Sequence, residues 1–118
     1  MAKHNETGLK GEQLAASFLE NKGYNILERN WRFSHKEVDL VLQFREWLVF
    51  AEVKTRRGLG YGYPEEAVTA GKQDFLKKAA EAYFEAHISF KKVRFDVISV
   101  VLDEWDGVVE MLHLEDAF

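Results

Sequence analysis

The chain contains no cysteine, which excludes disulfide bonds, a thiol nucleophile and thiolate metal sites. It also has no apolar run of about 18 residues, the length that a membrane-spanning helix needs. The first residues, MAKHNETGLKGEQ, lack the apolar core of a signal peptide. We therefore expect a cytoplasmic protein that does not associate with membranes.

The four histidines are scattered and show neither the H-x-H nor the H-x-x-x-H spacing that favours a zinc site. We expect them to be surface or structural residues. With 118 residues, of which 47% are hydrophobic, the chain is long enough for one domain with a modest core and too short for two. We therefore expect a single domain over residues 1–118.

Charge is distributed unevenly along the chain. The net charge of -4 argues against a nucleic-acid partner, because phosphates attract basic surfaces. However, residues 54–94 contain nine basic and five acidic residues, whereas residues 95–118 contain seven acidic residues and no lysine or arginine. Charges are screened over roughly 8 Å at physiological salt, so a central basic stretch can still bind a polyanion locally. The alternative, ordinary solvated surfaces, remains open on charge alone.

Periodicity predicts two helices and five strands. An amphipathic pattern that ends at Gly23 predicts the first helix, and the second follows a glycine-rich loop. Branched and aromatic runs between polar breaks predict the strands. The expected helices are 7–22 and 65–87, and the expected strands are 24–33, 37–44, 47–53, 93–102 and 108–114. A helix between two strands allows a right-handed crossover and a parallel pair, so we expect an α/β fold with a mixed five-stranded sheet flanked by helices, in the order α-β-β-β-α-β-β.

The stretch VFAEVKTRRG places an acid and a base, Glu52 and Lys54, on one face of a strand. If strands 37–44 and 47–53 form a tight hairpin that turns at residues 45–46, its register brings Asp39 opposite Glu52. Like charges at that spacing are destabilising. They become tolerable if one acid takes a proton, if Lys54 compensates, or if both bind a divalent metal ion such as Mg²⁺. An exposed ion pair between Glu52 and Lys54 is the simplest alternative.

Two helical residues are further candidates for this site. Glu12 lies at the margin of the apolar arc of the first helix, from which it can reach the sheet. Lys72 shares a helical face with apolar residues and therefore points inward. The structural alternatives are an exposed helical glutamate and a lysine whose stem covers apolar surface.

Four segments carry a resemblance to a known family: GEQLAASFLENKGYNILERNWR, EVDLVLQF, LVFAEVKTR and RFDVISV. Together they resemble the YraN-like family of predicted bacterial endonucleases, which is similar in fold to archaeal Holliday-junction resolvases and to the PD-(D/E)xK nuclease class. The match runs from Gly8 to about Val101. One departure is Lys36, which stands where the family usually has glycine. The resemblance implies a restriction-endonuclease-like fold.

The resemblance also implies a site and an activity. Asp39 and Glu52 would be ligands of Mg²⁺ or Mn²⁺, Lys54 the catalytic lysine, and Glu12 an additional acid near the metal. The implied function is a metal-dependent endonuclease that hydrolyses phosphodiester bonds in DNA, with branched or structured DNA such as Holliday junctions as substrate. The alternative is a non-catalytic module that keeps the nuclease fold and binds DNA or a protein partner.

Basic and aromatic residues around this site are expected to bind DNA. Tyr61 and Tyr63, on the glycine-rich loop, are candidates for stacking on unpaired bases. Two symmetric cuts in a junction call for a two-fold dimer, and the chain is compatible with a homodimer. The residues expected to hold backbone phosphates are Arg56, Arg57, Lys72, Lys77 and Lys78.

Overall fold

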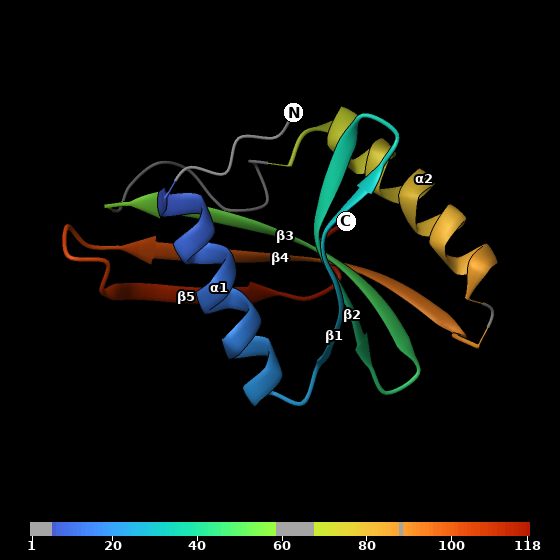
Figure 1. The fold of residues 1–118 in the computed structure, drawn as a ribbon, viewed down its shortest axis with the longest axis horizontal. Helices are drawn as coiled ribbons and strands as arrows, with labels where there is room; N and C mark the ends of the chain where they lie inside the picture. Colours follow the sequence, from blue (N-terminus) through green and yellow to red (C-terminus); the bar gives the residue numbers. More distant parts are fainter. Residues whose placement is uncertain (1–5, 59–67, 88) are drawn as a thin grey trace.

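The computed structural model describes residues 6–58, 68–87 and 89–118 (Figure 1). The helices and strands follow one another in the order that the sequence predicts. Within the described ranges, neither helix is long and apolar enough to cross a membrane. The elements are α1 (Glu6–Asn21), β1 (Asn25–Phe33), β2 (Lys36–Phe44), β3 (Trp47–Arg57), α2 (Ala70–Ala86), β4 (Lys92–Leu102) and β5 (Val108–Leu114).

The five strands form one mixed sheet in the spatial order β1-β2-β3-β4-β5. The pairs β1–β2, β2–β3 and β4–β5 are antiparallel, and β3–β4 is parallel. Helix α2 connects the two parallel strands, as expected for a crossover connection. The predicted mixed sheet flanked by helices is therefore confirmed, and it is consistent with a restriction-endonuclease-like fold.

A helix covers each face of the sheet, because the side chains of the central strand alternate. Val49 and Ala51 pack with α1, whereas Leu48 and Phe50 pack with α2. Such doubly covered strands read as continuous apolar runs, and the stretch from Leu48 to Ala51 is fully buried. The polar Glu52 that follows is therefore an exception within a buried strand.

Two element boundaries differ from the sequence-based expectation by more than one residue. Helix α2 begins at Ala70, where the Thr69 side chain caps it, and not at residue 65; residues 59–67 lie outside the described residues. Strand β3 continues past Val53 to Arg57, because its backbone pairs with β4 as far as Leu102. Strand pairing depends on the backbone and not on side-chain polarity, so the polar residues that follow Val53 remain in the strand. Lys54 therefore lies on the same strand as Glu52, as the sequence predicts.

Gly11 lets α1 approach β3 closely, which holds the neighbouring Glu12 against the sheet. A Cβ atom at residue 11 would lie 2.7 Å from the Cβ of Thr55, so Gly11→Ala forces the helix away. We expect the substitution to lower the free energy of unfolding by about 2 kcal/mol in urea titrations. Gly71→Ala is the matched control, since its nearest neighbour would be 4.0 Å away, and it should raise stability by about 0.5 kcal/mol. Equal effects of the two substitutions would contradict close packing at Gly11.

Candidate functional site

The hairpin of β2 and β3 has the register that the sequence predicts. Phe44 pairs with Trp47, and Leu42 pairs with Val49. The turn between the strands is short, and Arg45 adopts a left-handed conformation with φ of 57°. Regular pairing ends at Leu40 and Ala51, one step before the two acids. The site therefore begins where β2 leaves β3.

Asp39 lies at this point of separation. Val38 packs with the α2 side of the sheet and Leu40 with the α1 side, which indicates that β2 rotates at Asp39. The Asp39 carboxylate accepts a hydrogen bond of 2.8 Å from the backbone N–H of Val53. The Asp39 side chain thus takes the place of the next backbone hydrogen bond between β2 and β3. This hydrogen bond holds Asp39 beside β3, the strand that carries Glu52.

Glu52 is a buried acid with an unsatisfied oxygen. Its side chain is only 4% exposed, and its Oε2 atom has no hydrogen-bond partner. The pKa of Glu52 is raised to about 7, chiefly by burial and also by the negative charge of Asp39, whereas the charges of Lys72 and Lys54 act to lower it. Oε2 lies near the Lys72 ammonium group but accepts no hydrogen bond, and a buried carboxylate oxygen without one is costly.

Two lysines approach Glu52 from different elements. The Nζ of Lys54, on β3, lies 3.8 Å from Oε1, and the Nζ of Lys72, on α2, lies 3.6 Å from Oε2. Lys72 also donates a hydrogen bond of 3.1 Å to the carbonyl oxygen of Glu37, and its Nζ lies 5.1 Å from the centroid of the Phe75 ring. The predicted inward orientation of Lys72 is therefore seen, and α2 supplies a second cation to the strand pair.

The raised pKa of Glu52 predicts how stability depends on pH. An acid with a higher pKa in the folded state stabilises the fold below its unfolded value of 4.5, and this stability is lost as pH rises through about 7. The Glu52→Gln side chain cannot ionise. We therefore expect the free energy of unfolding of this variant to exceed that of the wild type by about 2 kcal/mol at pH 8. At pH 4.5 the difference should nearly vanish. Urea titrations at both pH values measure it, and a difference independent of pH would contradict the buried-acid description.

Glu12 and Asp39 line a common cavity of about 160 Å³ between α1, β1 and β2. The remaining lining residues are Leu9, Gln13, Arg29, Asn30 and Leu40. Glu52, Lys54 and Lys72 do not line the cavity. Asp39 is therefore the acid that connects the cavity with Glu52 on β3. The structure thus brings Glu12 and Asp39 to one cavity.

Asn30 is a residue of this cavity that was not predicted. Arg29 pairs with Leu40 and Trp31 with Val38, so Asn30 stands opposite Asp39 in the register. It has a left-handed backbone with φ of 50°, and its Oδ1 is buried without a hydrogen-bond partner. The β1–β2 register was the signal that could have found it, since the same counting that paired Asp39 with Glu52 pairs it with Asn30.

The acids offer two ligands, not three, to a metal ion. In residues 6–58, 68–87 and 89–118, no three histidine or acidic side chains are grouped closely enough to hold one. Asp39 and Glu52 are the pair that the hairpin brings together, and the unsatisfied Oε2 of Glu52 fits a hard cation. Mg²⁺ suits such a site, because it usually binds through one or two carboxylates and keeps several waters or substrate oxygens.

The residues expected to bind phosphates do not form one patch. Arg57, at the end of β3, donates hydrogen bonds of 2.5 Å to Asp103 and Asp106 of the β4–β5 turn, far from α2 in Figure 1. Lys78 pairs with Asp74 on the surface of α2, and Lys77 is exposed on that helix. Arg56 is half-buried on β3, and Lys72 is engaged with Glu52. Tyr61 and Tyr63 lie outside the described residues.

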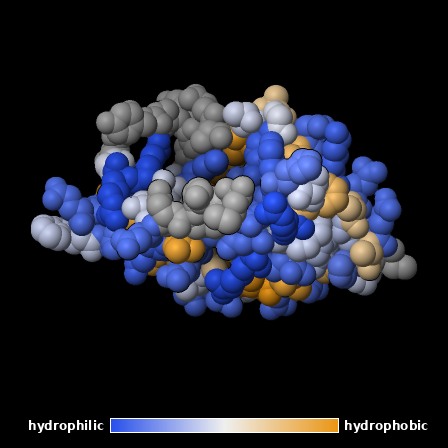
Figure 2. Space-filling view, turned by 45° about the horizontal axis from the view of Figure 1, so that its top comes forward, coloured by the Kyte–Doolittle hydropathy of each residue, from blue (hydrophilic) through white to orange (hydrophobic). Residues whose placement is uncertain are grey.

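On the face drawn in Figure 2, hydrophobic residues are dispersed among hydrophilic ones.

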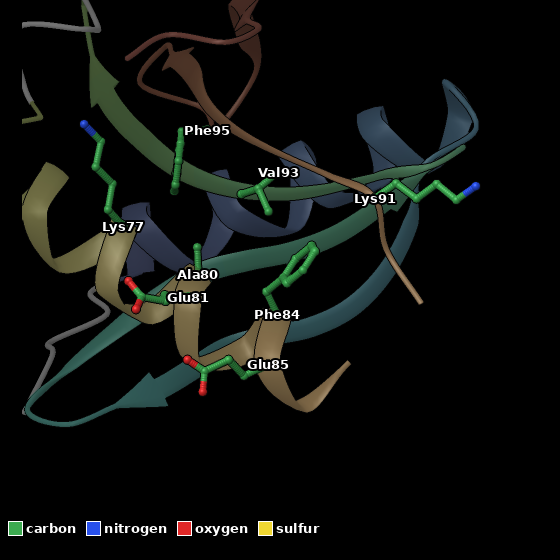
Figure 3. A pocket seen from close by; sticks show the side chains of 8 residues that line it. All are labelled: Lys77, Ala80, Glu81, Phe84, Glu85, Lys91, Val93 and Phe95. Carbon is green, nitrogen blue, oxygen red and sulfur yellow. The ribbon is translucent and has the colours of Figure 1, made fainter. Parts of the chain in front are cut away.

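A larger cavity, of about 440 Å³, lies between α2 and β4 (Figure 3). Phe84 and Phe95 point into it, and the ammonium groups of Lys77 and Lys91 are directed away from it at opposite ends. Its lining brings no set of polar groups together, which a specific small-molecule site requires. Among the described residues, buried acids and lysines meet instead at Glu52 on β3, next to the smaller cavity.

Comparison with known proteins gives consistent matches. The sequence model of the uncharacterised protein family UPF0102 matches residues 11–100. A UPF0102 protein of Rhodococcus opacus is 44% identical over 119 residues, covering 100% of both chains. Relatives in Flavobacterium psychrophilum and Syntrophomonas wolfei are 41% and 46% identical, covering 100% and 96% of this chain and 98% and 97% of their own.

Proposed function

Since this chain belongs to the uncharacterised protein family UPF0102, whose name assigns no activity, we propose a function from its geometry: a metal-dependent nuclease that hydrolyses phosphodiester bonds in DNA. One observation carries this proposal. Glu52 is a buried carboxylate with an unsatisfied oxygen, held beside Asp39 and within 4 Å of two lysines. Carboxylates and lysines are the groups that metal-assisted phosphodiester hydrolysis uses.

Each residue of the site has a part in this proposal. Asp39 and Glu52 would hold Mg²⁺ or Mn²⁺, which when bound supplies Lewis-acid polarisation of the scissile phosphate. Lys54 is half-buried, so its ammonium group can reach solvent to orient the attacking water and offset negative charge. Lys72 stays bound to the backbone of Glu37 and positions Glu52 through their ion pair. Glu12, which lines the cavity beside Asp39, is the additional acid.

The substrate that we propose is branched or structured DNA, such as a Holliday junction. This part rests on the resemblance to junction resolvases, and two symmetric cuts would require a homodimer. Basic side chains on α2, namely Lys77 and Lys78, would contact backbone phosphates, so binding should weaken steeply with salt.

A nicking assay tests the activity. Purified protein should nick a synthetic four-way junction in Mg²⁺ or Mn²⁺, nick a linear duplex of the same sequence more slowly, and do neither in EDTA. Equal nicking of both substrates would retain the nuclease proposal and reject the preference for branched DNA. Nicking that survives EDTA, or no nicking in either metal, would contradict metal-dependent hydrolysis.

A non-catalytic module that binds DNA or a protein is the second candidate. The absence of a three-acid group in the described part of the chain, together with the net charge of -4, favours it. Calorimetric titration with Mg²⁺ separates the two candidates. If the protein is a nuclease, Mg²⁺ should bind to the wild type and not to Asp39→Asn. If it is a non-catalytic module, no Mg²⁺ binding should depend on Asp39.

A further inference from the structure

Exposed hydrophobic side chains gather on one edge of the sheet. Among the described residues, five large hydrophobic side chains are exposed, and only Leu9 lies outside the region from Trp105 to Leu112. Scattered exposed apolar residues need no explanation, but a group on one strand indicates an interaction site. Strand β5 is also an outer strand of the sheet, with its free edge at the lower left of Figure 1. The grouped residues are Trp105, Val108, Val109 and Leu112.

Trp105 is presented by a rigid turn. Its side chain is 85% exposed, and its backbone N–H donates a hydrogen bond of 2.8 Å to the carboxylate of Asp103. The same carboxylate accepts from the N–H of Gly107, and Arg57 bridges the carbonyl of Asp103 and the side chain of Asp106. An aromatic residue on a fixed turn loses little conformational entropy on binding, which is typical of interface anchors.

The surroundings of this surface are predominantly acidic. Residues 95–118 contain no lysine or arginine, and the acids at residues 103, 104, 106, 110, 115 and 116 are all exposed. Among the described cations that reach these segments, Arg57 and Arg94 are paired with acids, and the Lys22 ammonium group lies 2.8 Å from Nδ1 of His113 on β5. The surface therefore offers apolar contacts within a field of unbalanced negative charge.

We propose that the β4–β5 turn and strand β5 dock an extended, lysine- and arginine-rich segment of a partner protein. The segment adds to the sheet beside β5, with Trp105 as its anchor. Backbone hydrogen bonds to the free edge would supply affinity, and alternating apolar and basic side chains would match the exposed valines and the acids. This interaction is independent of the proposed nuclease activity.

Charge and edge geometry favour this occupant over others. Nucleic acid is disfavoured because its phosphates would meet the exposed acids of residues 103–116. A second copy paired through β5 would bring two acidic segments together. Pairing of β5 with β1 of another copy would not close on itself, and the free edge of β1 is interrupted by a bulge near Ile26 and by the left-handed Asn30. Strand β5 also has a bulge, near Val109, but its residues from Glu110 to Leu114 pair with β4 without interruption.

Titration of the full chain with synthetic peptides tests the proposal. The probe is a peptide of alternating lysine and valine, about seven residues long. Its binding is measured by the changes that it causes in the amide chemical shifts of the protein in two-dimensional NMR spectra. We expect shifts confined to residues 103–114 and slower exchange of the β5 amides. Trp105→Ala should weaken binding by about 30-fold, whereas Leu9→Ala, at the exposed hydrophobic residue outside this surface, should leave it unchanged.

Two further peptides control for charge alone. A peptide with proline in place of every valine keeps the charge, loses the backbone N–H of each replaced residue and is disfavoured in a strand, and a glutamate–valine peptide reverses the charge. Both should fail to bind. Equal binding of the proline peptide, shifts outside residues 103–114, or no binding of the lysine–valine peptide would overturn the proposal. Sedimentation that shows a dimer disrupted by Trp105→Ala would assign the surface to a second copy and would also overturn it.

Discussion

Glu52→Gln should lower the rate of metal-dependent DNA nicking by about 100-fold or more, equivalent to about 2.7 kcal/mol of transition-state stabilisation. Glutamine keeps the shape of the side chain but removes the negative charge that would hold Mg²⁺ beside Asp39. It also leaves Lys54 and Lys72 without the charge they now face at 3.8 and 3.6 Å. Initial nicking rates at saturating Mg²⁺ measure the effect, and rates at higher Mg²⁺ show whether weaker ion binding explains it.

Glu46→Gln is the matched control for this experiment. Glu46 lies on the same hairpin, but its side chain is half exposed and pairs with Lys92 at 3.0 Å. Its substitution should leave nicking within about 2-fold of wild type, because exposed ion pairs contribute little. Since Glu52→Gln is also expected to stabilise the protein at pH 8, lost activity in a more stable protein would exclude unfolding as the cause. Equal nicking by wild type and Glu52→Gln would place the chemistry elsewhere.

Asp96→Ala should lower the free energy of unfolding by about 3 to 5 kcal/mol, the largest stability effect that we expect. Asp96 is fully buried on β4 and accepts hydrogen bonds from the Arg94 side chain at 2.8 and 2.9 Å. It also accepts from the His113 ring at 2.7 Å and from the backbone N–H of Asp116 at 3.0 Å. Removing the carboxylate leaves the buried charge of Arg94 without its main partner. Thermal or urea unfolding measures the loss.

The same network sets a pH dependence at the acidic end. Burial acts to raise the pKa of Asp96, but hydrogen bonds from His113, Arg94 and Asp116 outweigh it, and the net effect lowers the pKa. A lowered pKa stabilises the fold above the unfolded value of 3.8, and this stability is lost as pH falls through the lower folded value. The difference in free energy of unfolding between the wild type and Asp96→Ala should therefore become smaller in strong acid.

Asp74→Ala is the control for Asp96→Ala. Asp74 pairs with Lys78 at 3.1 Å, but both side chains are about two-thirds exposed. An exposed pair of this kind contributes only about 0.5 kcal/mol, so the substitution should be nearly neutral. A similar loss in both variants would contradict the role assigned to the buried network.

The sequence predicted the elements and the hairpin register because both follow from local patterns. The position of the short turn at residues 45–46 was sufficient to pair Phe44 with Trp47. The inward direction of Lys72 followed from helical periodicity in the same way. Residues close together in the sequence carry enough information for these contacts.

Contacts between distant segments could not be predicted in this way. The end of β3 at Arg57 depends on its pairing with β4, and the Asp39 cavity depends on how α1 packs over β1 and β2. The ion pair of Arg57 with Asp106 joins β3 to the β4–β5 turn, a contact that charge counting alone could not show. Rotation of β2 at Asp39 is likewise a tertiary effect, since it depends on the packing of Val38 and Leu40 against opposite faces.

The most direct test of the site is a crystal of the protein grown in Mn²⁺, examined by anomalous diffraction. The proposed site predicts one strong anomalous peak between the carboxylates of Asp39 and Glu52, on the side that faces the lysines, and its loss in Asp39→Asn. A peak bound by other residues, or none at these carboxylates in a crystal saturated with Mn²⁺, would contradict a metal centre at the divergence of β2 and β3.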